Sequence, residues 1–196
     1  MSEIFVIRQA HPADLPSLPD IERRASALFA GHDVEAGVLA DVTSLADFER
    51  AEAEGLLWVA IARGNTPVGF AFAEMIDGNV HLDELDVVPE YGRRGIGAAL
   101  VQEVCACAER RGANAVTLTT FRDIPWNAPF YATLGFEPLP ESAWTPALAR
   151  TVAKEAAGGL DPARRFLMRR QNTAARTGAS VGSGDDRNVD GTERGK

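Results

Sequence analysis

The segment VVPEYGRRGIGAAL, residues 87–100, has an unusual combination of residues. It combines β-branched residues, a proline, the adjacent cations Arg93 and Arg94, and two glycines, Gly95 and Gly97, that open an apolar segment. Glycine lets backbone amides approach a ligand closely, and the first turn of a helix presents unpaired N–H groups with a partial positive charge. The pattern therefore predicts a phosphate-binding junction between a strand and a helix.

Two common phosphate-binding motifs do not fit this segment. A Walker A loop needs a lysine after its last glycine, whereas Ala98 and Ala99 follow Gly97. A dinucleotide fingerprint needs a third glycine where Leu100 stands, and the preceding strand belongs to a set of predicted antiparallel hairpins. What remains is a pyrophosphate held by the amides of residues 93–98, with charge added by the two arginines.

Length and composition restrict the function. A chain of 196 residues with 45% hydrophobic content can bury one core, so we expect one domain. A net charge of −8 argues against a nucleic-acid partner and favours a cationic substrate. No apolar run is long enough to cross a membrane and the first residues do not resemble a signal peptide, so we expect a cytoplasmic protein without a membrane partner. Cys105 and Cys107 fit buried small hydrophobes better than a redox or metal pair, and we expect no metal.

Hydrophobic period and turn residues predict the order of the elements. The predicted strands are 4–10, 56–63, 68–76, 80–88, 115–121 and 164–170. The predicted helices are 12–31, 44–55, 96–110, 128–135 and 145–159, the last being an additional helix before the final strand. Residues 1–171 form the predicted domain. Residues 172–196 have almost no large apolar side chain to offset the ordering entropy, so we expect a disordered tail.

Local signals set several helix positions. Ile21, Ala25, Leu28 and Phe29 form one apolar stripe of the first predicted helix. Ser44 and Thr145 are expected to be the N-caps of two others, and glycines follow the last helical residues.

Two segments in the expected order resemble the GCN5-related N-acetyltransferase (GNAT) superfamily. LDVVPEYGRRGIGAAL resembles its acyl-CoA-binding motif, and NAPFYATLGFEPL resembles its second diagnostic segment through Tyr131, Gly135 and Phe136. The resemblance extends over residues 4–171. It implies an α/β (α+β) GNAT fold, with a mixed, mostly antiparallel central sheet that is splayed between its fourth and fifth strands and flanked by helices. One position departs from the family, because Gly92 stands where a Gln or Arg is usual.

The resemblance also implies an activity. The protein is expected to be an acetyl-CoA-dependent N-acetyltransferase, in which the primary amine of a small molecule or peptide attacks the thioester directly and coenzyme A thiolate leaves a tetrahedral intermediate. A monomer or a homodimer would fit. Two alternatives remain open: a non-catalytic acyl-CoA-binding sensor of the same fold, and a nucleotide-binding or structural α/β module.

The resemblance assigns the acetyl-CoA contacts to the end of the fourth strand, the glycine-rich turn and the helix with the tyrosine. The implied residues are Leu85, Asp86, Val87, Val88, Arg93, Arg94, Gly95, Ile96, Gly97, Ala98, Asn127, Phe130 and Tyr131. Tyr131 is the candidate donor to the leaving thiolate, although it would also suit packing against the sheet. Since a tyrosine has a pKa of about 10 and a thiol about 8.5, we expect a strengthening hydrogen bond and no complete proton transfer. Asn127 either bonds the pantetheine arm or caps its helix.

The general base is expected among His81, Asp83 and Glu84 on the fourth strand. On strict alternation His81 and Asp83 share one face, while Glu84 and Asp86 share the other. The family's acids and histidines fall at His81 and Asp83, but a bulge in its fourth strand makes Glu84 a rival. Each of the three also fits the polar face of a half-exposed strand, so the base stays open.

Two further residues are candidates for the acceptor site. Glu22 lies on the first helix, which borders the acceptor in this family, and with Asp83 and Glu84 it could bind a second cationic group. It would equally suit a solvated helix surface. Phe121, near Trp126, would wall the acceptor pocket or pack in the core.

Overall fold

The computed structural model describes residues 5–32, 34 and 42–172. Within them, a seven-stranded sheet has the order β1-β2-β3-β4-β5-β7-β6, in which the β4–β5 pair is parallel and the other neighbours are antiparallel. The strands are β1 (Val6–Gln9), β2 (Leu57–Ala62), β3 (Thr66–Ile76), β4 (Asn79–Val87), β5 (Ala115–Phe121), β6 (Glu137–Pro138) and β7 (Arg165–Gln171). The predicted mixed, mostly antiparallel sheet is confirmed.

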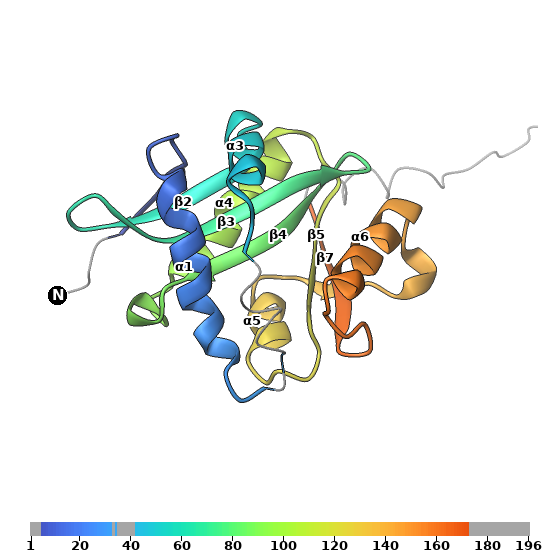
Figure 1. Ribbon diagram of the computed structural model, residues 1–196. Helices are drawn as coiled ribbons and strands as arrows, with labels where there is room; N and C mark the ends of the chain where they lie inside the picture. The colour runs from blue at the N-terminus through green and yellow to red at the C-terminus, as the bar shows by residue number, and fades with distance from the viewer. Residues whose placement is uncertain (1–4, 33, 35–41, 173–196) are drawn as a thin grey trace, which may run out of the picture.

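Helices flank this sheet. They are α1 (Leu18–Ala25), α3 (Leu45–Ala53), α4 (Ile96–Arg110), α5 (Asn127–Thr133) and α6 (Pro146–Ala157). Short 3-10 segments occur at Leu15–Ser17, Ser26–Phe29, Pro89–Tyr91 and Glu141–Ala143. Helices α1 and α3 pack on one face of the sheet and α4 on the other, while α6 lies beside β7 (Figure 1).

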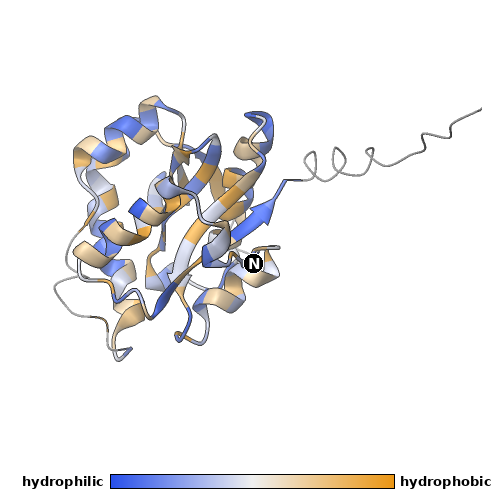
Figure 2. Cartoon of the chain, turned by 90° about the vertical axis from the view of Figure 1, so that its right-hand side faces the viewer, coloured by the Kyte–Doolittle hydropathy of each residue, from blue (hydrophilic) through white to orange (hydrophobic). Residues whose placement is uncertain are grey.

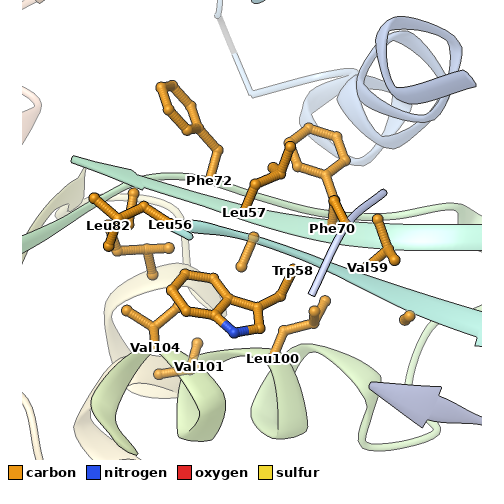
Figure 3. Close-up of a cluster of buried hydrophobic side chains, with 14 of the residues drawn as sticks. Leu56, Leu57, Trp58, Val59, Phe70, Phe72, Leu82, Leu100, Val101 and Val104 are labelled. Atoms are coloured by element: carbon orange, nitrogen blue, oxygen red, sulfur yellow. The ribbon is translucent and has the colours of Figure 1, made fainter. Parts of the chain in front are cut away.

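The main core occupies both faces of β2, β3 and β4. On the α1 and α3 face, the ring of Phe48 lies 5.3 Å from that of Phe70 and 6.1 Å from that of Phe72. On the opposite face, the buried Trp58 points toward α4 and the fully buried Leu100 (Figure 3). A smaller cluster that includes Leu148 and Leu167 packs α6 against the sheet.

Hydrophilic and hydrophobic residues alternate along the helices, while the inner strands are mainly hydrophobic (Figure 2). The longest described helix, α4, has 15 residues, and none in the described part of the chain is both long and apolar enough to cross a bilayer. Cys105 and Cys107 are buried on α4, as predicted.

Local cap and turn chemistry confirms the element boundaries. Ser44 accepts from the amide of Asp47 at 3.2 Å, and Thr145 accepts from the amide of Leu148 at 3.2 Å. The β3–β4 hairpin turns through Asp77 and Gly78 with φ of 49° and 74°, values that suit a two-residue hairpin turn.

The first predicted helix is shorter than expected. Its α-helical part ends at Ala25 and continues as the 3-10 segment Ser26–Phe29, where the hydroxyl of Ser26 donates to the carbonyl of Arg23 at 2.8 Å. A 3-10 segment has about three residues per turn, so the 3.6-residue stripe loses its register. Leu28 is therefore 49% exposed, which makes its predicted place in the buried stripe wrong.

Strand β6 was not predicted. Its two residues, Glu137 and Pro138, pair with Arg169 and Met168 of β7. A two-residue strand with a proline has no alternation to detect, so its pairing depends on β7 and not on its own sequence.

Strands β4 and β5 separate after a short paired region, as the resemblance implied. They pair at Val80, His81 and Leu82 of β4, and β5 continues to Phe121 beside β7. Strand β4 also carries the expected bulge, because Leu82 lies opposite Ala73 while Glu84 lies opposite Phe72. Asp83 is the extra residue.

The predicted boundary at residue 171 can be compared only with Asn172, because residues 173–196 lie outside the described residues. Asn172 is 1% exposed and donates from its side chain to the carbonyl of Ala113 at 2.6 Å. Its backbone amide donates to the carbonyl of Asn114 at 2.9 Å. The structured part of the chain thus includes Asn172. Residues 33 and 35–41, between the first two predicted helices, also lie outside the described residues.

Candidate functional site

The junction between β4 and α4 exposes backbone amides. After the 3-10 turn, Arg93 has a φ of 58° and Gly95, the N-cap of α4, a φ of 85°. No side chain caps this helix, and the first intrahelical bond runs from the amide of Ala99 to the carbonyl of Gly95. The start of α4 therefore has the free amides and the dipole that favour an anion.

The side chains before α4 fix the shape of this turn. Arg94 donates to the carbonyl of Glu90 at 2.7 Å, and its guanidinium carbon lies 5.0 Å from the centroid of the Tyr91 ring. A Cβ at Gly92 would lie 3.1 Å from the carbonyl oxygen of Pro89. The departure from the family at Gly92 thus has a local reason, since the tight turn leaves little room for a side chain.

Gly97 lies beside two other predicted cofactor contacts, Leu85 and Phe130. A Cβ built on Gly97 would lie 3.4 Å from Cζ of Phe130 and 4.0 Å from Cδ2 of Leu85. Helix α5 therefore meets the first turn of α4 beside the end of β4. A Cβ would fit here in ordinary van der Waals contact, whereas the further atoms of a larger side chain would press on Phe130.

The end of β4 offers backbone groups toward the splay. In the described residues β4 has no β5 partner beyond Leu82, although residues 84–87 still pair with β3. Backbone groups directed toward the splay are thus available to an extended ligand, as at the edge of a sheet.

The bulge at Asp83 changes which side chains share a face. Glu84 and Asp86 lie opposite Phe72 and Phe70, which pack against α3, so both carboxyls belong to the α1 and α3 face. His81 precedes the bulge and falls on the same face. Strict alternation was therefore wrong here, and the expected change of face is confirmed.

Three carboxyls gather on this face, and we name Glu22, Glu84 and Asp86 the acid cluster. Burial, then the charges of Asp86 and Glu22, raise the pKa of Glu84 well above its usual range. Burial and the charge of Glu22 do the same to the pKa of Asp86. Glu22 accepts from the amide of Thr43 at 3.0 Å, which ties α1 to the residue before the Ser44 cap.

Asp86 is the unusual member of the acid cluster. It is 8% exposed, and its Oδ2 is buried with no hydrogen-bond partner among the described residues. A buried, unpartnered carboxyl oxygen costs free energy unless a ligand satisfies it. The resemblance assigned Asp86 only to cofactor contacts. The sequence feature that could have indicated a role for its side chain is the presence of an acidic residue in the otherwise apolar LDVV run.

Tyr131 lies within the electrostatic influence of the acid cluster. Burial, followed by the charges of Glu84 and Asp86, raises the pKa of Tyr131 above its usual range. Its ring packs 5.0 Å from that of Phe130 and 5.9 Å from that of Phe136. The hydroxyl therefore stays protonated at neutral pH and can donate a hydrogen bond.

His81 and Asp83 have neighbours outside the acid cluster, Thr117 for His81 and Glu74 for Asp83. His81 has no exposed surface, its Nδ1 lies 2.8 Å from Oγ1 of Thr117, and its Nε2 has no partner among the described residues. Burial, with a contribution from Arg165, lowers the pKa of His81 to about 4. Burial and the charge of Glu74 raise the pKa of Asp83 to about 6. His81 is thus neutral at pH 7.

The remaining candidates lie beside α5. Phe121 is 5% exposed, and its ring centroid lies 5.6 Å from that of Phe29, which in turn lies 5.3 Å from Trp126. Trp126 is the N-cap of α5, so the predicted capping role of Asn127 is wrong. Asn127 is buried in the first turn.

Two hollows of the described surface lie away from these residues. One of about 400 Å³ lies between the β3–β4 hairpin and α6 and includes Lys154. The other, of about 230 Å³, lies between α4, α5 and β7 and includes Cys105. No predicted site residue lines either hollow. The candidate site is therefore identified by its carboxyls, its tyrosine and its free backbone amides, and not by a hollow. In the described residues no cluster of acids, histidines and cysteines could hold a metal ion.

Comparison with known families decides the identity of this architecture. The model of the acetyltransferase (GNAT) family matches residues 23–136, more than half of the 196-residue chain. The chain belongs to the GNAT acetyltransferase family. The matched range includes the α4 junction, the acid-bearing end of β4 and Tyr131, so these features lie within the family domain.

Solved structures share the GNAT fold with this chain. The PaiA N-acetyltransferase from Thermoplasma acidophilum, in complex with coenzyme A, is 18% identical and has a TM-score of 0.66, with 86% of this chain and 99% of that chain covered. The ribosomal-protein-S18-alanine N-acetyltransferase from Escherichia coli is 18% identical and has a TM-score of 0.58, with coverages of 95% and 100%. At these identities the likeness establishes the fold alone.

Proposed function

We propose that this GNAT protein transfers an acetyl group from acetyl-CoA to the nitrogen of a primary amine. The observation that carries the proposal is one arrangement: the uncapped start of α4 meets α5 at Gly97 and Phe130, and the next residue of α5, Tyr131, lies near the acid cluster. An anion site, a hydrogen-bond donor and buried carboxyls are the groups that amine acetylation needs.

The residues present fit acetyl-CoA. The amides from Gly95 to Ala98 suit the pyrophosphate, and the backbone groups from Leu85 to Val88 that do not bond to β3 suit the pantetheine arm. When bound, acetyl-CoA supplies the reactive acetyl thioester. PaiA N-acetyltransferase, whose structure contains coenzyme A, provides support from a protein of the same fold.

The acid cluster and Tyr131 divide the chemistry between them. We assign proton removal from the acceptor ammonium to Glu84, because a carboxyl with a raised pKa is a better base toward an amine. The amine nitrogen then bonds to the acetyl carbon to give a tetrahedral intermediate, which expels coenzyme A thiolate as the carbon–sulfur bond breaks, and the second proton of the attacking nitrogen passes to solvent. Tyr131 donates a hydrogen bond to the departing sulfur, and its raised pKa favours donation without loss of the proton.

The first test separates cofactor binding from fold. Replacing Gly97 by Val places side-chain atoms against Phe130, so calorimetry with acetyl-CoA should show affinity lower by about tenfold or more. Ala106→Val is the matched control, since it adds a β-branched residue to the same helix away from the junction. Unchanged affinity in folded Gly97→Val would contradict the binding site, and tighter binding of ATP than of acetyl-CoA by the wild type would contradict the function.

A further variant, Tyr131→Phe, tests the chemistry. Tyr131→Phe should lower turnover, followed by thiol release with a panel of primary amines, by about tenfold or more while acetyl-CoA affinity holds. Wild-type turnover in Tyr131→Phe would remove its assigned role.

A further inference from the structure

We propose that the acid cluster is a two-ammonium subsite, and that the acceptor is a short alkyl diamine or polyamine: its reacting amine lies at Glu84 and its second ammonium between Asp86 and Glu22. This inference rests on the proposed function and specifies its substrate class.

The geometry of β4 sets the spacing of the two positions. Glu84 and Asp86 are two residues apart after the bulge and share one face. A strand rises about 3.3 Å per residue, so their Cα atoms are roughly 6–7 Å apart along the chain. Two carboxyls at this spacing match the two ammonium groups of a short diamine better than they match the single ammonium group of a monoamine.

The electrostatic order distinguishes the two ends. Glu84 lies nearer than Asp86 to Leu82, the last residue of β4 that pairs with β5, and its charge also acts more strongly on Tyr131, so we assign Glu84 to the reacting end. For Asp86 the neighbouring charge is that of Glu22 on α1. The second ammonium therefore belongs on the α1 side, away from the thioester.

Three arginines near the acid cluster pair with carboxylates outside it. On α1, Arg23 pairs with Asp20 at 3.2 Å and Arg24 with Glu90 at 3.0 Å. Arg165, whose charge lowers the pKa of Glu84, pairs with Glu155 at 3.0 Å. An ammonium group of a dicationic ligand would supply the hydrogen-bond donor that Oδ2 of Asp86 lacks, and an amino acid would bring a repelled carboxylate to the same position.

The experiment uses the full chain with coenzyme A present and three acceptors of equal carbon-chain length: putrescine, n-butylamine and γ-aminobutyrate. Calorimetry should show putrescine binding about tenfold or more tightly than n-butylamine, with γ-aminobutyrate weakest. In Asp86→Asn the advantage of putrescine over n-butylamine should disappear. Asp20→Asn is the control, because it removes an exposed carboxyl from α1 and should retain the advantage.

Either of two binding results overturns the inference: equal binding of putrescine and n-butylamine to the wild type, or an undiminished putrescine advantage in Asp86→Asn. Acetyl transfer from acetyl-CoA to both amines at equal kcat/KM would also overturn it, while leaving the proposed function intact. Asp86-dependent putrescine binding without any acetylated product would support the subsite and contradict the proposed function. Thermal unfolding without ligand verifies that each variant is folded.

Discussion

Buried side chains on the two faces of the sheet have opposite effects on the stability of the folded state. Under α4 the sheet presents Trp58, which meets apolar side chains such as Leu100 and Val104 (Figure 3). Under α1 and α3 the same strands combine aromatic packing with Glu84 and Asp86, whose burial raises their pKa values. One face gains free energy from every group it buries, whereas the other retains charges that destabilise the folded state until a ligand arrives.

The side chains that stabilise the fold under α4 and the carboxyls of the candidate site therefore lie on opposite faces of the sheet. A well-packed face can hold the fold while the opposite face carries groups that packing alone would exclude. Truncating a core side chain on the α4 face and neutralising Asp86 on the other face should therefore change stability in opposite directions.

The largest effect is expected on the α4 face. Leu100 is fully buried, so Leu100→Ala should lower the free energy of unfolding by about 2–5 kcal/mol, through lost burial and a cavity. Leu28→Ala is the control, since Leu28 is 49% exposed and should cost far less. Urea denaturation at pH 7 measures both. A Leu28→Ala loss as large as that of Leu100→Ala would refute the assignment of Leu28 to the surface.

The second effect depends on pH and on His81. Its pKa is about 4 in the folded protein and about 6.5 when unfolded, so the unfolded state binds the proton first. Wild-type stability should thus fall as the pH drops from 6.5 to 4, by roughly 2–3 kcal/mol relative to His81→Gln. Urea denaturation at several pH values follows the difference. Parallel stability curves for the two proteins would contradict a buried neutral imidazole.

The smallest effect has the opposite sign. The pKa of Asp86 is raised by folding, so its contribution is favourable below the unfolded value of about 4 and is lost as the pH rises. Asp86→Asn should therefore stabilise the protein at pH 8 by about 1 kcal/mol or more and give no gain at pH 4. Thermal unfolding at both pH values tests this. Destabilisation at pH 8 would show that Asp86 has a stabilising partner.

Local chemistry made much of the fold predictable. Ser44 and Thr145 cap their helices through side-chain bonds to residues three positions later, so a short window contains all the information. The glycines before α4 likewise indicate their own turn. The end of α1 failed because the hydroxyl of Ser26 bonds back to Arg23 and the helix tightens, which a hydrophobic stripe does not indicate.

The candidate site was less predictable, because its faces depend on pairing. Whether Glu84 joins His81 on one face is decided by the extra residue Asp83 opposite β3, and nothing in the β4 sequence alone marks the bulged position. The resemblance identified Tyr131, but the orphaned oxygen of Asp86 is a tertiary property. It depends on which groups α1 and α3 bring to that face.

The splay between β4 and β5 has a consequence for cooperativity. Three residue pairs join β1–β4 to the β5, β7 and β6 strands within the sheet, so few interstrand bonds connect the two groups. Regions with few shared bonds can open separately, and amide exchange measures such local opening. A ligand that bridges the separated ends of β4 and β5 would join the two strand groups into one unfolding unit, slowing exchange in β5 and β7 far from any atom that it contacts.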